Sequence, residues 1–174
     1  FYWENFSSRL LPIGIDAWWQ DATEPEKGKT RYAKDSSPMY RRPPIDRCVE
    51  FCKAHGIEPR EHALAYEHFF PKWLYDASID EVKEALENRY REISERYKND
   101  IPTIEITNEM GWPKGRTAFY EDPDYVEWCF RLAEKYFPEN EITINEETII
   151  SWAEYGRTTG RYYAYTEALI QKGV

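Results

Sequence analysis

A carboxylate and an amide stand side by side at the end of a short apolar segment, where Asn108 and Glu109 follow residues 103–107. Apolar residues alternate within that segment, and a stretch containing glycine and proline follows at 111–115. This pattern predicts a buried strand that carries both side chains at its C-terminal end, where parallel α/β folds bind their ligands. A carboxylic acid can protonate a leaving oxygen while an amide holds a neighbouring hydroxyl, and cleavage of a glycosidic bond requires both.

The elements that must position this pair alternate between helix and strand from residue 44 onward. Ser78, with Glu81 three positions later, predicts a capping box at the start of one helix. Strand–helix alternation implies parallel strands joined by right-handed crossovers. Hydrophobic periodicity and breaker residues predict helices over 44–55, 78–99, 123–137 and 158–172, and strands over 59–67, 103–109 and 141–147.

Two of the predicted helices show which side faces the core. In the helix over 78–99, we expect the inner residues to be Val82, Leu86, Ile93 and Tyr97. In the helix over 44–55, we expect them to be Ile45, Cys48, Val49 and Cys52. With Cys129 on another helix, the cysteine count is odd, which favours packed, reduced thiols over a disulfide framework or a metal site.

Length and composition restrict the class of protein. The 174 residues are enough for one core, so we interpret residues 1–174 as a single domain. A net charge of −9 with no basic stripe argues against a nucleic-acid partner, and no apolar run is long enough to span a membrane. No signal peptide is visible. Aromatic residues make up 17% of the chain, and such rings can line troughs on which sugar faces stack.

Four segments together resemble glycoside hydrolase family 10, the retaining xylanases. The turn at 24–29 resembles the one after that family's second strand, and residues 61–74 resemble its third strand, usually written G-H-x-L-x-W…P-x-W. Residues 96–109 resemble the signature R-Y-K…W-D-V-x-N-E, and residues 142–146 resemble the fifth strand, I-N-D-Y. The order and spacing of these segments agree from about residue 24 to 174.

The resemblance implies a TIM (β/α)8 barrel of roughly 250 residues or more, of which this chain covers about the first half to five-eighths. It would run from near the second strand to the fifth helix. If Trp3 matches the tryptophan of the second strand, the domain carries an insertion near residues 4–23. If Trp18 and Trp19 match instead, no insertion is needed. The sequence leaves both alignments open.

The resemblance also implies roles for individual residues. Glu109 would be the general acid/base, and Asn108 would hold the sugar 2-hydroxyl. His62 falls on a histidine that contacts the sugar in the subsite before the cleaved bond. Tyr66 and Trp73 could stack on sugar rings. Without the resemblance, His62 and the two rings are equally consistent with ordinary packing.

Some positions depart from the family pattern. Tyr66 and Glu67 stand where tryptophan and histidine are usual, and Glu147 stands where tyrosine is usual. A retaining glycosidase also needs a carboxylate nucleophile about 5 Å from the acid/base. In this family the nucleophile lies on the seventh strand, beyond Val174, and Glu147 would stand in the wrong register to replace it. We therefore expect a nucleophile from outside this chain.

Two other classes of protein stay open beside a xylanase. One is a non-catalytic carbohydrate-binding or structural half-barrel, which would self-associate to cover its exposed sheet edges. The other is a related retaining glycosidase acting on another β-linked glycan. We expect no cofactor and no metal, since His62, Glu67, His68 and Glu109 lack a known ligand spacing. Because xylan cannot enter a cell, we expect the enzyme to be secreted or periplasmic.

Overall fold

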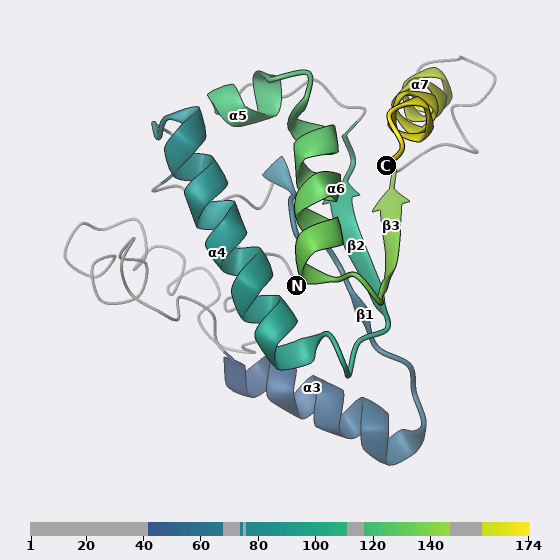
Figure 1. Ribbon diagram of the computed structural model, residues 1–174. Helices are drawn as coiled ribbons and strands as arrows, with labels where there is room; N and C mark the ends of the chain where they lie inside the picture. The colour runs from purple at the N-terminus through teal and green to yellow at the C-terminus, as the bar shows by residue number, and fades with distance from the viewer. Residues whose placement is uncertain (1–41, 68–73, 75, 111–116, 147–157) are drawn as a thin grey trace.

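The computed structural model describes residues 42–67, 74, 76–110, 117–146 and 158–174. Within these residues the chain alternates between helices and the strands of one sheet (Figure 1). The strands are β1 (Arg60–Glu61), β2 (Thr103–Asn108) and β3 (Glu141–Asn145). The helices are α3 (Arg42–His55), α4 (Ile79–Tyr97), α5 (Ala118–Glu121), α6 (Tyr125–Tyr136) and α7 (Thr158–Gln171).

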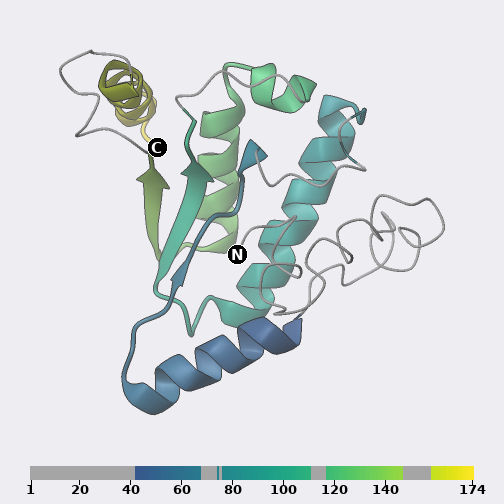
Figure 2. The same ribbon diagram turned by 180° about the vertical axis from the view of Figure 1, so that it is seen from behind.

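The sheet is parallel, with the order β1-β2-β3. Helices α4 and α6 cover one of its faces, and α3 lies at the end where the strands begin (Figures 1 and 2). Helices α5 and α7 lie at the other end, toward which the strands point. Two consecutive strand–helix–strand units of this kind confirm the predicted alternation and place the C-terminal ends of the strands together.

Helix α4 follows its local sequence signals closely. The Ser78 side chain accepts a hydrogen bond from the Glu81 N–H at 3.3 Å, and a Glu81 carboxylate oxygen accepts one from the Ser78 N–H at 2.9 Å. This is the predicted capping box. The inner face is also as expected, because its members are all buried: Val82, Leu86, Ile93 and Tyr97.

The core lies between the sheet and helices α4 and α6. Ile104 and Ile106 of β2 are fully buried there, together with Leu64 from the segment after β1. The helices contribute aromatic and aliphatic side chains that include Tyr90, Phe119, Phe130 and Phe137. Burying these side chains contributes about 1.5–3 kcal/mol for each large one, which is the main driving force for docking the helices.

The segment Arg96-Tyr97-Lys98, part of the family-like signature, joins α4 to α3. The Tyr97 hydroxyl donates to a carboxylate oxygen of Asp46 at 2.7 Å, and an Arg96 nitrogen lies 3.4 Å from the other oxygen. Burial and the Asp46 contact raise the pKa of Tyr97 to about 12, so this hydroxyl stays a donor. Helix α3, which carries Asp46, lies at the end of the sheet where the strands begin, whereas Glu109 follows the C-terminal end of β2 (Figure 1).

Three sequence predictions need correction. The strand predicted over 59–67 is regular only at Arg60–Glu61, because the carbonyls of Ala63 and Leu64 accept from the Arg89 side chain instead of a strand. The helix predicted over 123–137 is confirmed as α6, but the short α5 precedes it and was not predicted.

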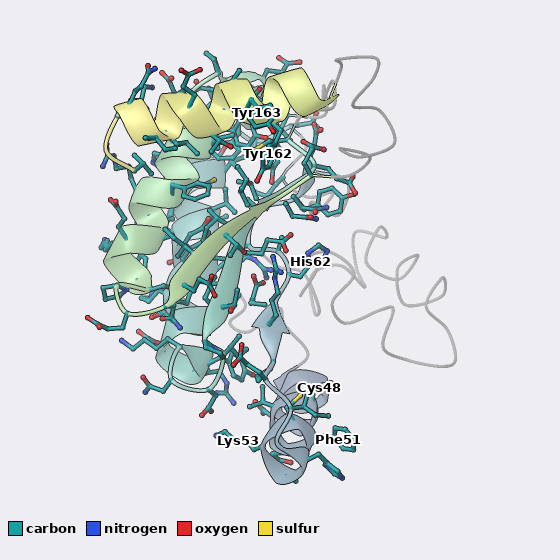
Figure 3. All side chains as sticks on the ribbon, turned by 90° about the vertical axis from the view of Figure 1, so that its right-hand side faces the viewer. Cys48, Phe51, Lys53, His62, Tyr162 and Tyr163 are labelled. Atoms are coloured by element: carbon teal, nitrogen blue, oxygen red, sulfur yellow. The ribbon has the colours of Figure 1, made fainter. Side chains whose placement is uncertain are left out.

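The third correction concerns α3. Val49 is buried as expected, but Cys48 is exposed and Cys52 is only half-buried, so these two cysteines do not belong to a buried face. The side chain of Ile45 lies outside the described ones. Helix α3 packs at the end of the strands and not along the sheet face, which buries a smaller part of its circumference (Figure 3). The first forty residues, with both alternative alignments of the second strand, lie outside the described residues.

Candidate active site

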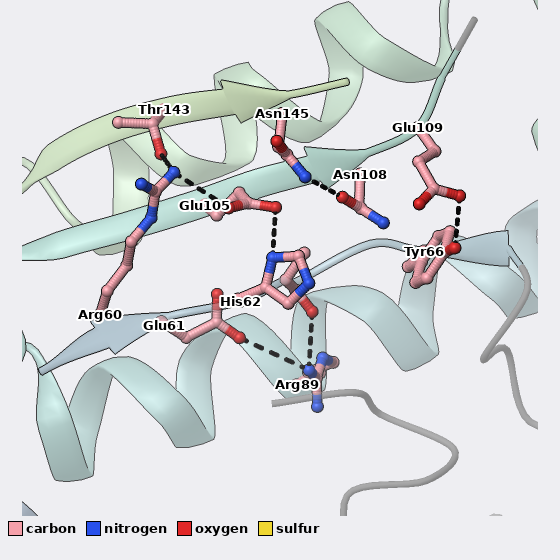
Figure 4. A network of polar contacts seen from close by, with 11 residues as sticks. Arg60, Glu61, His62, Tyr66, Arg89, Glu105, Asn108, Glu109, Thr143 and Asn145 are labelled. Carbon is pink, nitrogen blue, oxygen red and sulfur yellow. Dashed lines mark hydrogen bonds and ion pairs between the residues drawn. The ribbon is translucent and has the colours of Figure 1, made fainter. Parts of the chain in front are cut away.

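A bulge in β2 brings two side chains that are three residues apart, Glu105 and Asn108, to the same face of the sheet. The pairing of β2 with β3 shifts between Glu105 and Thr107, so that Glu105 is level with Thr143 and Asn108 with Asn145. Thr143 and Asn145 are two residues apart and share a face of β3. Glu105 and Asn108 are three residues apart, yet the extra residue of the bulge lets both reach that same face (Figure 4).

Glu109 follows β2 directly and has a left-handed backbone conformation, with φ of 50°. Its N–H donates to the Asn145 carbonyl at 3.0 Å, which continues the ladder between β2 and β3 by one residue. A residue other than glycine in this conformation costs about 1–2 kcal/mol, so the neighbouring strand must hold it in place. The result is a carboxylate with a fixed backbone at the C-terminal end of the sheet.

Asn108 lies beside it and is buried. Its side-chain oxygen accepts a hydrogen bond from the Asn145 side-chain nitrogen, across the β2–β3 pair (Figure 4). This contact fixes the amide plane of Asn108 and directs its oxygen toward β3. In the sequence Asn145 was only part of a motif, without a role of its own, whereas in the structure its side chain donates to Asn108 and orients it.

Tyr66 reaches Glu109 from the segment that follows β1. Its hydroxyl donates a hydrogen bond to the Oε2 atom of Glu109 (Figure 4). Ala65, the residue before Tyr66, pairs with Thr107 of β2, so Tyr66 stands level with the Asn108–Glu109 pair. The sequence predicts a ring that stacks on sugar, whereas the structure adds a polar contact with the proposed acid/base.

His62 also belongs to this face. Its Nδ1 atom lies 2.6 Å from Oε1 of Glu105, and an Arg60 nitrogen lies 3.0 Å from Oε2 of the same carboxylate. Arg60 donates in addition to the Thr143 hydroxyl at 3.0 Å, which ties all three strands together. Because its Nδ1 is committed to Glu105, the imidazole is held in one orientation. The sequence singled out His62 but neither Glu105 nor Arg60.

A buried ion pair supports the segment that carries His62 and Tyr66. Arg89 of α4 is fully buried and lies 3.7 Å from the equally buried Glu61, while it donates to the Leu64 carbonyl at 2.9 Å and to the Ala63 carbonyl at 3.1 Å. Desolvation raises the pKa of Glu61, and the Arg89 charge opposes that shift. The side of the segment that faces the helices is thereby fixed by one guanidinium group.

Glu109, Asn108 and Tyr66 are therefore brought to one end of the sheet, and His62 lies on the same polar face beside Glu105, midway along β2. Trp73, the remaining predicted sugar-binding residue, lies outside the described residues, as do His68 and Glu147. Among the residues that the structure describes, no three histidine, cysteine, aspartate or glutamate side chains are placed to hold a metal ion. No helix in the described ranges is long and apolar enough to cross a membrane.

Comparison with known proteins decides the family. The model of glycosyl hydrolase family 10 matches residues 14–174. The chain belongs to this family. Endo-1,4-beta-xylanase B of Cellvibrio japonicus is 24% identical over 138 residues, and endo-1,4-beta-xylanase A of Halalkalibacterium halodurans is 27% identical over 124 residues. These matches cover 78% and 58% of this chain but only 23% and 31% of the relatives.

Solved family 10 structures share the fold. The Paenibacillus barcinonensis enzyme, described as a GH10 structure, superposes with a TM-score of 0.70 at 19% identity and covers 88% of this chain and 55% of its own. Xylanase 10B from Thermotoga maritima gives 0.70 at 21% identity, with 84% and 46% covered. The chain therefore forms part of a TIM (β/α)8 barrel and spans about half the length of these structures.

Because the three strands belong to a family 10 barrel, their two ends can be assigned different functions. Active sites of TIM barrels lie at the C-terminal ends of the strands. Asn108, Glu109 and Tyr66 lie at that end, whereas Arg60 lies at the start of β1 and Glu105 midway along β2. The polar face of the sheet thus carries Glu109 and its neighbours at the C-terminal end of the strands, and the ion pairs of Glu105 lie closer to the start of the strands.

Proposed function

We propose that this chain supplies the general acid/base half of a retaining endo-1,4-β-xylanase. The observation that carries the proposal is the placement of Glu109 beside Asn108 at the C-terminal end of β2, at the positions that match the family signature. Glycoside hydrolysis with retention requires such a carboxylic acid next to the scissile bond. The similarity to several endo-1,4-beta-xylanases makes xylan the substrate we expect.

In the first step, Glu109 in its acid form gives its proton to the glycosidic oxygen as the bond to the anomeric carbon breaks. A carboxylate nucleophile, contributed by sequence that this chain does not include, attacks that carbon and forms a covalent glycosyl-enzyme. In the second step, Glu109 as a carboxylate takes a proton from water, and the resulting hydroxide displaces the nucleophile. The acid/base is therefore regenerated in each cycle.

The neighbouring residues bind and orient the sugar in this proposal. Asn108 contacts the 2-hydroxyl of the sugar whose bond is cleaved, an interaction that strengthens in the transition state. His62, oriented by Glu105, contacts the same sugar. Tyr66 and Trp73 offer aromatic faces to sugar rings. Each of these contacts stays a proposal.

The experiment uses the intact protein that carries this chain, with its mass verified by mass spectrometry. Glu109→Ala is assayed on xylan and on a dinitrophenyl β-xylobioside, whose leaving group needs no protonation. We expect a loss of about 10²- to 10⁴-fold on xylan and a much smaller loss in kcat/KM on the activated substrate. Azide should then restore turnover by attacking the xylobiosyl-enzyme and yielding a β-xylobiosyl azide.

A matched control separates these effects from general damage. Glu141→Ala removes a carboxylate that is exposed at the start of β3, far from Glu109 along the strands, and should leave activity unchanged. If Glu109→Ala were as active as Glu141→Ala on xylan, Glu109 would not be the acid/base.

The two rival functions give different outcomes in the same assay. A binding module or structural half-barrel shows no turnover before substitution, and Glu109→Gln leaves its affinity for xylo-oligosaccharides intact. A retaining glycosidase for another β-glycan shows the same dependence on Glu109, but with higher kcat/KM on that glycan than on xylan. The departures at Tyr66 and Glu67 are the reason to include other β-glycans in the panel.

A further inference from the structure

Tyr66 and Glu109 are joined side chain to side chain. The phenolic hydroxyl donates to Oε2 of the carboxylate, and Figure 4 shows the two groups pointing toward each other from neighbouring segments of the sheet. We propose that Tyr66 is a positioning residue for the acid/base Glu109, and that this hydrogen bond, more than stacking of the ring on a sugar, is its contribution to the reaction. This inference rests on the proposed function.

The backbones on both sides of the contact are fixed. On the Tyr66 side, the Ala65 N–H donates to the Ile106 carbonyl at 3.0 Å, and the Ala65 carbonyl accepts from the Asn108 N–H at 3.2 Å. On the Glu109 side, the N–H donates to the Asn145 carbonyl at 3.0 Å. A hydrogen bond between two side chains on anchored backbones restricts rotation about the Glu109 side-chain bonds at little further entropic cost.

A second layer holds the Tyr66 segment from behind. The buried guanidinium of Arg89 donates to the carbonyls of Ala63 and Leu64, three and two residues before Tyr66. These contacts come from α4, on the opposite side of the segment from the polar face. The segment is therefore held by β2 on one side and by α4 on the other, so the phenol approaches Glu109 from a rigid support.

The hydrogen bond has a chemical consequence for the proton. A carboxylic acid donates through one oxygen and accepts through the other. When Tyr66 donates to Oε2, the acidic proton of Glu109 belongs on Oε1, which is then the atom that protonates the glycosidic oxygen. In the second step the proton from water returns to Oε1, while Tyr66 continues to donate to Oε2. No proton leaves Tyr66 in either step.

This arrangement is particular to the residue found here. The family motif usually places tryptophan at the position of Tyr66, and an indole has no hydroxyl group. A tyrosine ring presents a smaller stacking surface but adds a donor and acceptor at its tip. Tyrosine in place of tryptophan therefore has less stacking area but gains a contact with the acid/base. Removing only the hydroxyl oxygen separates the stacking role from the positioning role.

The experiment compares Tyr66→Phe with Tyr136→Phe in the intact protein. Tyr136 is a matched control, because its hydroxyl also donates to a glutamate, Glu87, at 2.8 Å, but between α6 and α4 on the outer helical layer. For each variant kcat/KM is measured on two β-xylobiosides, one with a dinitrophenyl and one with a phenyl leaving group. Thermal unfolding verifies that each variant is folded.

If Tyr66 acts through Glu109, Tyr66→Phe should lose about 10-fold or more in kcat/KM on the phenyl substrate, which needs the acid, and less than about 3-fold on the dinitrophenyl substrate. Tyr136→Phe should match the parent on both. In a Glu109→Ala background, adding Tyr66→Phe should change little, since the partner of the hydroxyl is already absent. This non-additivity is the signature of positioning.

Other results would overturn the inference in distinguishable ways. Equal losses on both substrates, or additive losses with Glu109→Ala, would mean that Tyr66 binds sugar and does not position the acid/base. No turnover by the parent on either substrate would overturn the proposed function and this inference with it. If Tyr66→Phe fails to fold, Tyr66→Leu also lacks a side-chain donor, and retention of full activity on the phenyl substrate by that variant would contradict the role of the hydroxyl.

Discussion

Nδ1 of His62 lies 2.6 Å from Oε1 of Glu105, although 43 residues separate them in the chain. The Glu105 side chain is only 3% exposed, and its Oε2 atom also accepts a hydrogen bond from Nη2 of Arg60 at 3.0 Å. One carboxylate therefore orients a histidine on the segment after β1 and an arginine at the start of β1. Both contacts cross from β2 to the neighbouring segment that contains β1, so Glu105 links the two at their polar face.

We predict that Glu105→Ala destabilises the protein by about 1–3 kcal/mol, because it removes the acceptor of two charge-assisted hydrogen bonds within the sheet. It should also weaken binding of xylo-oligosaccharides, since the imidazole of His62 loses its fixed orientation. Urea unfolding and calorimetric titration with xylotriose measure the two effects.

Glu141→Ala, which alters an exposed carboxylate of the same sheet, should change stability by no more than about 0.5 kcal/mol. Equal unfolding free energies for the two variants would contradict this account.

A second prediction concerns the buried pair of Glu61 and Arg89. Desolvation places the folded-state pKa of Glu61 above its unfolded value, so the folded protein binds this proton more tightly. The contribution of Glu61 to stability is therefore greatest below the unfolded pKa and is lost as pH rises through the folded one. Glu61→Gln cannot ionise, so its stability relative to the parent should improve between about pH 4 and about pH 7. Urea unfolding at both pH values measures the change, and a difference that does not vary with pH would disprove the raised pKa.

Arg89→Met tests the other member of the pair. It removes a guanidinium group that lies 3.7 Å from the buried Glu61 carboxylate, and it removes the donors to the carbonyls of Ala63 and Leu64. We predict a loss of about 3–5 kcal/mol, which is the usual cost of breaking a buried pair from one side. Arg91→Met on the same helix is the control, because Arg91 is exposed and donates to the Asn88 side-chain oxygen at 2.8 Å. Similar unfolding midpoints for the two variants would contradict a structural role for Arg89.

The cysteines give a prediction that needs no activity assay. Burial raises the pKa of the Cys129 thiol to about 12, so only about one molecule in 10⁴ carries the reactive thiolate near pH 8. Cys48 is exposed on α3. Iodoacetamide should therefore modify Cys48 well before Cys129, and peptide mass spectrometry after timed quenching gives the order. Modification of Cys129 at the rate of Cys48 in folded protein would show that the core around α6 opens.

Signals within a few residues predicted the elements well, because they depend on local chemistry. Ser78 and Glu81 form their capping box three residues apart, and the apolar period of α4 selects its buried face. The Asn108–Glu109 pair was likewise found from a short pattern and from the family resemblance. Its exact setting was not predictable, because the bulge between Glu105 and Thr107 depends on how β2 pairs with β3.

The supporting residues were missed for a related reason. In the sequence, Arg89 is one of many charged residues on its helix, and nothing distinguishes it from the others. It is buried because α4 docks on the segment after β1. Asn145 and Glu105 look like ordinary polar residues of strands until their partners on other strands are known. Contacts between segments about 25 to 45 residues apart have no local sequence signal, so the sequence can suggest candidate site residues but not the contacts that hold them in place.

The contact between Asn145 and Asn108 leads to the last prediction. The Asn145 side-chain N–H donates to the Asn108 oxygen, which fixes the Asn108 amide in one of its two orientations. In Asn145→Asp that donor becomes an acceptor, so the Asn108 amide should rotate and turn its nitrogen toward residue 145. In the proposed mechanism, Asn108 would then present a different group to the sugar 2-hydroxyl. We expect kcat/KM on a xylobioside to fall about 10-fold, and the loss to shrink on the corresponding 2-deoxy substrate, which lacks that hydroxyl. Equal losses on the two substrates would show that Asn145 acts on the fold of the site and not through the 2-hydroxyl contact of Asn108.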